Sequence, residues 1–223
     1  MTQAEDAPTT LSTTSGRTDY WNGYYSSHRP AARPLPSQFA TFVAGELEGP
    51  HRVIELGCGN GRDALFFAEY GHEVLGVDAS AAAVEACTGL AGTLGSSARF
   101  LQASIDEDDL ADRLGASDRP TVVYARFFLH AITEEEEGRL LDLSAAVTQP
   151  GGLLAVEYRT VRDASLAKVT DAHFRRYAVP AEVEARALQR GYEAAYAVEG
   201  FGYAKYRHDD AYVARALFRK HGS

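Results

Sequence analysis

The chain has 223 residues, 45% of them hydrophobic, which suits one globular domain with a substantial core. Its formal net charge of −9 argues against a nucleic-acid partner that is held by a general basic surface. The two cysteines, Cys58 and Cys87, make neither a disulfide framework nor a structural zinc site, and no apolar run or signal pattern indicates a membrane. We expect a cytoplasmic protein without a metal site, and the sequence leaves its oligomeric state open.

The N-terminal part of the chain is expected to have two sections. Residues 1–16 are rich in Thr, Ser and Ala, which predicts a flexible lead-in. Residues 17–50 carry an aromatic cluster at 20–25 and, after a proline-rich linker, a helix that Ser37 caps. The aromatic rings either anchor the N-terminus on the core or form a lid over a ligand.

The central feature of the sequence is a glycine-rich turn between a strand and a helix. Residues 53–56 predict a buried strand, Gly57, Gly59 and Gly61 follow at alternate positions, and a helix begins at about Arg62. Glycine tolerates a positive φ and lets a ligand approach the backbone, and the free N–H groups of a helix start bind polar ligand atoms. Such a turn suits a dinucleotide pyrophosphate or the amino-acid part of S-adenosylmethionine (SAM).

Two carboxylates narrow this choice. Glu55 lies just before the turn, where a dinucleotide fingerprint stays apolar, and Asp78 follows a second strand, 21 residues after Gly57. That spacing is close to the roughly 20 residues expected for an acid that binds ribose hydroxyl groups. The segments Glu-Leu-Gly-Cys-Gly-Asn-Gly (55–61) and Gly-Val-Asp-Ala-Ser (76–80) resemble the class I SAM-dependent methyltransferases. The resemblance covers roughly residues 50–158, with a weaker continuation to the C-terminus, and is to small single-domain members that act on small molecules.

This resemblance implies an α/β fold in a domain over residues 51–223. The expected architecture is a Rossmann-like, doubly wound, seven-stranded sheet, mostly parallel with an antiparallel last strand. Further strands are predicted at 99–103, 121–125, 153–159, 192–201 and 211–219. Thr133 and the four glutamates after it form a capping-box pattern, and the glutamates are expected to be the solvated start of a helix.

The resemblance also implies how the cofactor binds. SAM is expected over the glycine turn, with its ribose on Asp78 and its amino-acid end near Glu55, and with the aromatic segment folded across it as a lid. Many family members have an Asp where this chain has Ser104, so the adenine is expected to contact Ser104 and Ile105 instead. The full cofactor set is Tyr25, Glu55, Gly57, Cys58, Gly59, Asn60, Gly61, Asp78, Ala79, Ser104, Ile105, Ala125 and Arg126.

The acceptor is expected beyond the carboxyl ends of the strands, where open α/β sheets bind ligands. The resemblance implies that residues 160–179, after the fifth strand, cover it. His130 and His173 are candidate general bases because histidine titrates near neutrality, and a structural hydrogen bond is the alternative role for each. Arginines at this rim predict an anionic substrate, unless they pair with neighbouring acids and hold the cover in place. The substrate set is Tyr24, His28, Arg126, Arg159, Arg175, Arg176 and Tyr177.

The sequence therefore predicts a SAM-dependent methyltransferase that acts on a small, polar, anionic metabolite in a biosynthetic pathway. One alternative uses the aminocarboxypropyl arm of SAM, by transfer or cyclisation, and releases methylthioadenosine. A second alternative is a non-catalytic SAM-binding module, which would need a blocked substrate mouth. A nicotinamide-binding domain fits least, because the Gly-x-Gly-x-x-Gly spacing is missing.

Overall fold

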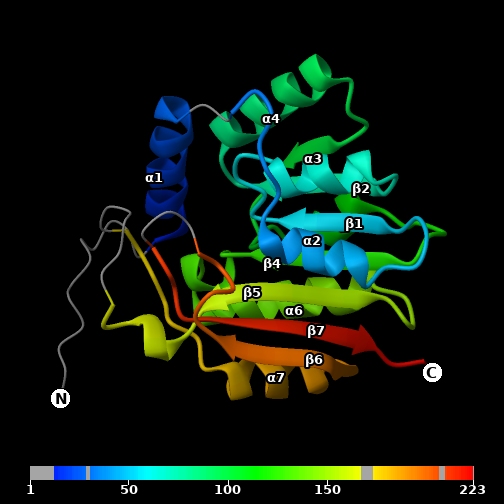
Figure 1. The fold of residues 1–223 in the computed structure, drawn as a ribbon, viewed down its shortest axis with the longest axis vertical. Helices are drawn as coiled ribbons and strands as arrows, with labels where there is room; N and C mark the ends of the chain where they lie inside the picture. Colours follow the sequence, from blue (N-terminus) through cyan, green and yellow to red (C-terminus); the bar gives the residue numbers. More distant parts are fainter. Residues whose placement is uncertain (1–12, 29–30, 167–172, 206–208, 223) are drawn as a thin grey trace.

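A seven-stranded sheet forms the centre of the molecule (Figure 1). The computed structural model describes residues 13–28, 31–166, 173–205 and 209–222. The strands are β1 (Arg52–Leu56), β2 (Glu73–Asp78), β3 (Arg99–Gln102), β4 (Thr121–Arg126), β5 (Leu153–Arg159), β6 (Tyr192–Gly200) and β7 (Val213–Lys220). The helices are α1 (Thr14–Ser27), α2 (Gln38–Gly45), α3 (Arg62–Glu69), α4 (Ala81–Leu94), α5 (Leu110–Leu114), α6 (Glu134–Val147) and α7 (Pro180–Leu188), with short 3-10 turns η2 (Leu129–Ala131) and η3 (Val161–Asp163).

The strand order is β3-β2-β1-β4-β5-β7-β6. Strand β1 pairs in parallel with β2 and β4, whereas β7 pairs antiparallel with β5 and β6. The predicted sheet, mostly parallel with an antiparallel last strand, is confirmed. The parallel strands end at one edge of the sheet, and α1 stands beyond that edge in Figure 1. This edge is where ligands bind in open α/β sheets.

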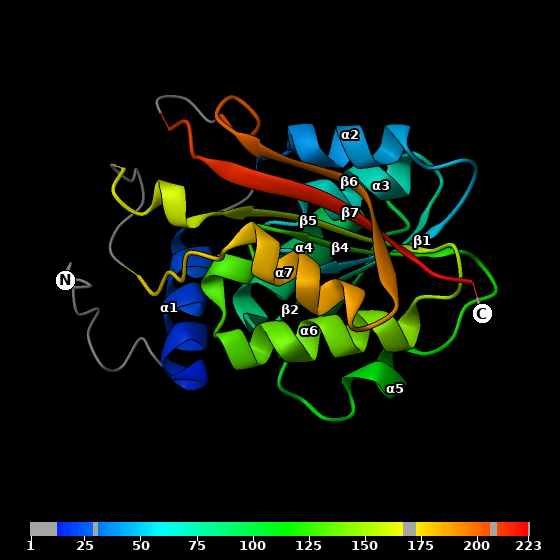
Figure 2. The same cartoon turned by 90° about the horizontal axis from the view of Figure 1, so that it is seen from below.

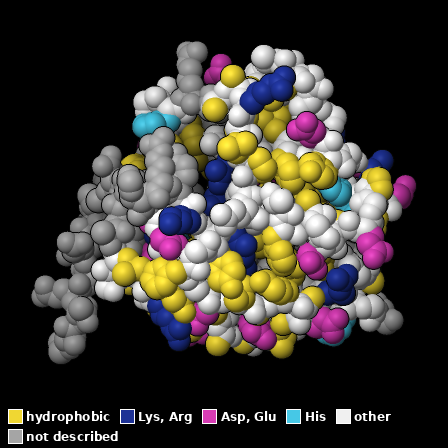
Figure 3. Space-filling model, in the orientation of Figure 1, with side chains coloured by type: hydrophobic (Ala, Val, Ile, Leu, Met, Phe, Trp, Pro, Cys, Tyr) yellow, Lys and Arg dark blue, Asp and Glu magenta, His cyan; other side chains and the backbone are white. Residues whose placement is uncertain are grey.

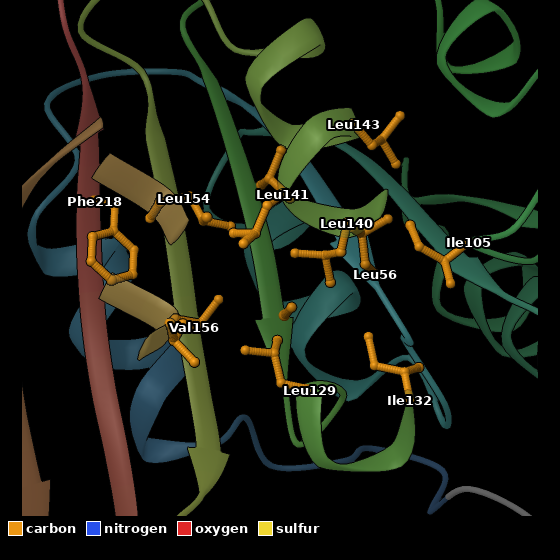
Figure 4. Close-up of a cluster of buried hydrophobic side chains, with 14 of the residues drawn as sticks. Leu56, Ile105, Leu129, Ile132, Leu140, Leu141, Leu143, Leu154, Val156 and Phe218 are labelled. Atoms are coloured by element: carbon orange, nitrogen blue, oxygen red, sulfur yellow. The ribbon is translucent and has the colours of Figure 1, made fainter. Parts of the chain in front are cut away.

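Helices cover both faces of the sheet, with α2 and α3 on one side and α6 and α7 on the other (Figure 2). On the first side, Phe39 of α2 and Phe67 of α3 pack against the strands. On the other side, Leu140 and Leu141 of α6 belong to one buried cluster with Leu154 and Val156 of β5 (Figure 4). Because both faces are covered, every residue of β1 is buried, the apolar Val53, Ile54 and Leu56 together with the charged Arg52 and Glu55.

Two helices begin at the caps that the sequence analysis predicts, Ser37 and Thr133, and α4 begins at a third cap, Ser80. The side chains of Ser37, Ser80 and Thr133 each accept a backbone N–H three residues further on. At Thr133 the capping box is complete, because the Glu136 carboxylate accepts the Thr133 N–H in return at 2.7 Å. Caps of this kind each contribute about 1 kcal/mol to the stability of a helix start. The loops that lead into these three helices therefore end at fixed positions.

The acidic start of α6 is not wholly solvated, which corrects the prediction for it. Glu136 is 6% exposed and Glu137 is fully buried. Glu136 pairs with Arg17 of α1, while Glu137 pairs with Arg176 and, at 2.7 Å, with Arg186 of α7. A carboxylate is buried only when cations accompany it, and these cations come from segments that are distant in the sequence.

The start of α1 revises one predicted boundary. Helix α1 begins at Thr14, inside the segment 1–16 that is predicted to be a flexible lead-in. Residues 1–12 lie outside the described residues, so the prediction for them stays a prediction. Across the described part of the chain, no helix combines the length and the apolar character that a membrane crossing needs.

Candidate cofactor and acceptor site

A cavity of about 650 Å³ lies at the carboxyl ends of the parallel strands. The glycine turn after β1, the ends of β2 and β4, and the inner side of α1 contribute to its wall. The segment after β5 adds His173 and Arg175, and the loop before β7 adds Tyr203. Figure 3 shows a recess on this side of the molecule in which dark-blue Lys or Arg atoms are visible. The volume is in the range of small-molecule sites.

The glycine turn has no room for side chains at Gly57, Gly59 or Gly61, and the last two show why. Gly59 has φ +53°, and a Cβ atom there would collide with the Tyr25 hydroxyl. Gly61 has φ +70°, and a Cβ atom there would lie 2.7 Å from Cys87 Sγ. Both conformations are rare for other residues, so glycine is required at each position, and at Gly59 the backbone itself lines the cavity.

Asp78 holds this turn from the end of β2. Its Oδ2 accepts the Gly59 N–H at 2.8 Å, and its Oδ1 accepts the Ser80 N–H at 2.9 Å. Burial raises the pKa of Asp78, although both hydrogen bonds act in the opposite direction. The carboxylate lines the cavity and is fixed by two backbone donors, so it suits the recognition of neighbouring hydroxyl groups such as those of a ribose.

Glu55 supplies a buried carboxylate that is incompletely paired. It is 4% exposed and lines the cavity, and its Oε2 has no hydrogen-bond partner among the described residues. Burial raises its pKa well above the ordinary value, and the nearby Asp63 raises it further. A buried polar atom without a partner is uncommon, and a ligand ammonium would satisfy this one. SAM carries an ammonium group of this kind. The site therefore fits SAM, because the ammonium would supply the partner that Glu55 Oε2 lacks among the described residues.

A buried network behind the turn was not predicted. Asp63 accepts the N–H and the hydroxyl of Ser37, both at 2.7 Å, and the Tyr124 hydroxyl at 2.9 Å. It thereby joins α2, α3 and β4. The only sequence signal was an acid in the first turn of a helix, which is common and says nothing of these partners.

Helix α1 brings aromatic side chains to the cavity. The Trp21 ring stacks on Tyr25 with centroids 5.8 Å apart and meets the His173 ring edge-on at 5.2 Å. The Tyr20 ring stacks on His173 at 5.1 Å. Burial and, next, Asp78 raise the pKa of Tyr25 well above its ordinary value. These rings lie between the glycine turn and the segment after β5, where a lid is expected, and lid movement stays a prediction.

Replacing Arg17 with alanine is expected to loosen α1. The buried Arg17 guanidinium pairs with Glu136 and lies 5.0 Å from the centroid of the Phe174 ring. A hydrogen bond to a charged group contributes roughly 1.5–3 kcal/mol, so its loss should shift α1 toward undocked states. Trp21 is the single tryptophan of the chain, and its emission should move to the red and become easier to quench with acrylamide.

The matched control for this variant is Arg33→Ala, which removes an exposed arginine outside the cavity wall. Its Trp21 emission should equal that of the parent protein. An unchanged spectrum for Arg17→Ala would show that the ion pair does not hold α1.

The other end of the cavity carries paired arginines. Arg126 pairs with Glu157 at 2.7 Å, and Arg159 pairs with Asp163 at 2.7 Å and with Asp209 at 2.5 Å. These ion pairs are the alternative that the sequence left open, in which the arginines hold neighbouring segments in place. Although they are paired, Arg126 and Arg159 both still line the cavity.

Phe127 separates these two arginines and was not predicted as a site residue. The guanidinium carbons of Arg126 and Arg159 lie 4.3 Å and 5.5 Å from the centroid of its ring. Its φ of +55° is the only positive value among the described residues other than glycine, and this value is uncommon for a bulky side chain. Such strain often marks a functional site, and no sequence signal announced it.

His130 is buried at the same end of the cavity. Its Nδ1 lies 3.4 Å from the Arg159 N–H and accepts a hydrogen bond from it. Burial lowers the pKa of His130 well below its ordinary value, and the charge of Arg159 lowers it further. At neutral pH the ring is therefore uncharged.

The cavity wall includes every predicted site residue except Gly61, Ala125, His28, Arg176 and Tyr177. Gly61 begins α3, and Ala125 is buried within β4. His28 is exposed and stacks on Tyr24, with ring centroids 4.2 Å apart. The Arg176 guanidinium binds Glu137 and the Leu129 and Ile132 carbonyls instead.

Comparison with known proteins places the chain in a family. The model of the methyltransferase domain family matches residues 25–204. The chain is 26% identical over 144 residues to the uncharacterized methyltransferase YcgJ of Bacillus subtilis, which is 64% of this chain and 54% of that protein. It is 28% identical over 107 residues to the 2-heptyl-1-hydroxyquinolin-4(1H)-one methyltransferase of Mycobacteroides abscessus, covering 48% of this chain and 44% of that protein. The chain thus spans about half the length of these curated relatives.

The fold is shared with solved structures. The CcbJ methyltransferase of Streptomyces caelestis superposes with a TM-score of 0.69 at 20% identity, over 92% of this chain and 98% of that one. The chain belongs to the methyltransferase domain family. It contains a SAM-dependent transferase domain, and its cofactor is SAM.

Proposed function

We propose that this chain transfers the methyl group of SAM to a small, polar, anionic metabolite in a cytoplasmic biosynthetic pathway. The observation that carries the proposal is one cavity whose wall includes the glycine turn and Asp78 at one end and His130 and Arg159 at the other. The curated relative from Mycobacteroides abscessus supports a small-molecule acceptor, because it is named for 2-heptyl-1-hydroxyquinolin-4(1H)-one.

The residues of the chain would act mainly by holding and orienting the reactants. When bound, SAM supplies an electrophilic methyl group on a sulfonium. Asp78 would hold its ribose and Glu55 its ammonium, which fixes the direction in which the cofactor lies. The rings of Tyr25 and Trp21 exclude water from the cavity. Correct positioning of two reactants lowers a barrier by roughly 7–11 kcal/mol, so a methyltransferase needs little further chemistry from its protein.

The charges around His130 support an anionic acceptor. Burial is the main cause of the lowered pKa of His130, and four neighbouring side chains lower it further, so the local potential is positive. They are Arg159, His173, Arg175 and Arg126, of which the three arginines carry a permanent positive charge.

The first experiment incubates the pure protein with SAM alone and follows the adenosyl products by mass spectrometry. We expect SAM to survive and to be recovered bound to the protein. The Asp78→Ala variant serves as the control and should retain no SAM. Methylthioadenosine that forms faster than in buffer would mean that the aminocarboxypropyl arm reacts, and the methyl-transfer proposal would fail.

The second experiment screens acceptors for the release of S-adenosylhomocysteine. The panel pairs each carboxylate, phosphate or acidic phenol with a neutral or cationic analogue of the same shape. We expect turnover with anionic members and little turnover with their partners. Turnover that favours the cationic members would contradict the anionic part of the proposal while leaving methyl transfer intact.

A further inference from the structure

We propose that the acceptor atom is an oxygen that is already ionised, as in an acidic phenol, that His130 binds it as a hydrogen-bond donor, and that neither His130 nor His173 deprotonates it. This inference rests on the proposed function and specifies its acceptor. It differs from the sequence-based prediction, in which either histidine is a general base.

The first step of the argument is the tautomer of His130. The backbone N–H of Arg159 can only donate, so the His130 Nδ1 that it contacts at 3.4 Å must be the unprotonated nitrogen. The neutral ring then carries its hydrogen on Nε2. The ring is held in place, because Phe127 packs edge-on against it at 5.2 Å and the His130 carbonyl accepts the Arg176 N–H at 2.8 Å.

The same reasoning applies to His173. The Arg175 Nη2 lies 3.3 Å from its Nδ1, and a guanidinium has hydrogen-bond donors only. The Tyr20 hydroxyl lies 3.3 Å from the same nitrogen. A neutral His173 therefore also carries its hydrogen on Nε2. Both rings line the cavity, and in both the nitrogen that could take up a proton is already used as an acceptor.

The second step is the charge around these rings. The groups that act on His130 are Arg126 from β4, Arg159 from β5, and His173 and Arg175 from the segment after β5. Among the described residues, the carboxylates Glu157, Asp163 and Asp209 are bound to the guanidinium groups of Arg126 and Arg159. Burial is the first cause of the low pKa of His130, and the positive charges lower it further. The same charges would also lower the pKa of an acceptor hydroxyl.

The reaction then balances without a protein base. The hydroxyl loses its proton to solvent before or on binding. A lone pair of the oxyanion forms the new O–C bond to the methyl group, and the electron pair of the broken C–S bond stays on sulfur. The products are a neutral methyl ether and S-adenosylhomocysteine. An amine acceptor suits this site poorly, because its protonated form would be repelled by the same cations.

The test of His130 uses the full chain with ¹⁵N-labelled histidine and NMR of the ring nitrogens. We expect His130 to have an unprotonated Nδ1 and a protonation midpoint below the ordinary value for histidine. The variants His130→Gln and His72→Gln assign the signals, the second being a buried histidine outside the cavity. An Nδ1–H tautomer, or a protonation midpoint near the ordinary value of about 6.5, would overturn the donor role.

The test of the acceptor class uses 4-nitrophenol as the probe and needs no turnover. The protein is saturated with S-adenosylhomocysteine, and the visible absorbance of the phenolate is followed against pH. The pKa of the bound probe should fall by about one unit, the lower end of the effect of an adjacent opposite charge. His130→Ala should weaken binding of the phenolate about tenfold, whereas His130→Gln, which keeps an N–H donor, should change it less than about threefold.

Three results would overturn the proposal: a bound probe with an unshifted or raised pKa, no binding of 4-nitrophenol to the saturated protein, or equal binding of the uncharged 4-nitroaniline. Calorimetry with SAM alone separates this failure from failure of the proposed function. A protein that binds SAM but not the phenolate keeps its cofactor assignment and loses only the acceptor assignment.

Discussion

Replacing Asp78 with alanine should lower the affinity for SAM at least 100-fold, measured by isothermal titration calorimetry. Both carboxylate oxygens accept backbone N–H groups, from Gly59 and Ser80, and the same carboxylate is expected to bind the ribose hydroxyls. Hydrogen bonds to a charged group contribute roughly 1.5–3 kcal/mol each, and a 100-fold change corresponds to about 2.7 kcal/mol. The variant loses the contacts that fix the glycine turn as well as those to the ligand.

Two further variants make this result specific. Asp78→Asn keeps one acceptor oxygen and should fall between the parent and the alanine variant. Asp106→Ala removes an exposed acid after the neighbouring strand that does not line the cavity, and should bind SAM as the parent does. An affinity within about threefold of the parent for Asp78→Ala would refute the cofactor assignment at this position.

Replacing Glu157 with alanine should lower the free energy of unfolding by about 3–5 kcal/mol in urea denaturation. Glu157 is fully buried and pairs with Arg126 at 2.7 Å and with Arg215 at 2.6 Å. Its removal leaves two guanidinium groups in the interior without their counter-ion. The free-energy cost of these unpaired charges exceeds the net stability that the ion pairs contribute. Since Arg126 also stacks on Phe127, the acceptor end of the cavity should lose its shape as well.

The control for Glu157 is an ion pair of the same chemistry on the surface. Glu199 pairs with the exposed Arg162 at 3.2 Å, and Glu199→Ala should change the free energy of unfolding by less than about 1 kcal/mol. If the two variants lost equal stability, the buried position of Glu157 would have no special importance.

The predictions that succeeded rest on signals within a few residues of the chain. Val53, Ile54 and Leu56 of β1 are apolar because both faces of the strand are covered, and Ser37 and Thr133 cap helices through bonds to residues three positions away. The glycine turn is local in its backbone, because the positive φ of Gly59 favours that residue, whereas the contact that forbids a Cβ atom there comes from Tyr25 of α1. For such features the sequence contains both the structure and its cause.

The features that escaped prediction are contacts between distant segments. Nothing near Glu137 in the sequence indicates that Arg176 and Arg186 neutralise it, so an acidic run of ordinary appearance proved to be partly buried. The role of His130 likewise depends on which ring nitrogen accepts the Arg159 N–H, and the sequence alone does not indicate this. Residue types predicted which side chains gather at the cavity better than they predicted what each one does there.

The carboxylate of Glu136 binds α6 and α1 at the same time. Its Oε2 accepts the Thr133 N–H at the start of α6, while its Oε1 accepts the Thr14 hydroxyl at 3.1 Å and pairs with Arg17 of α1. If α1 moved away, the capping bond would still keep this carboxylate in place. The part of α6 that receives α1 is thus preorganised, so docking of α1 would cost little conformational entropy in Glu136.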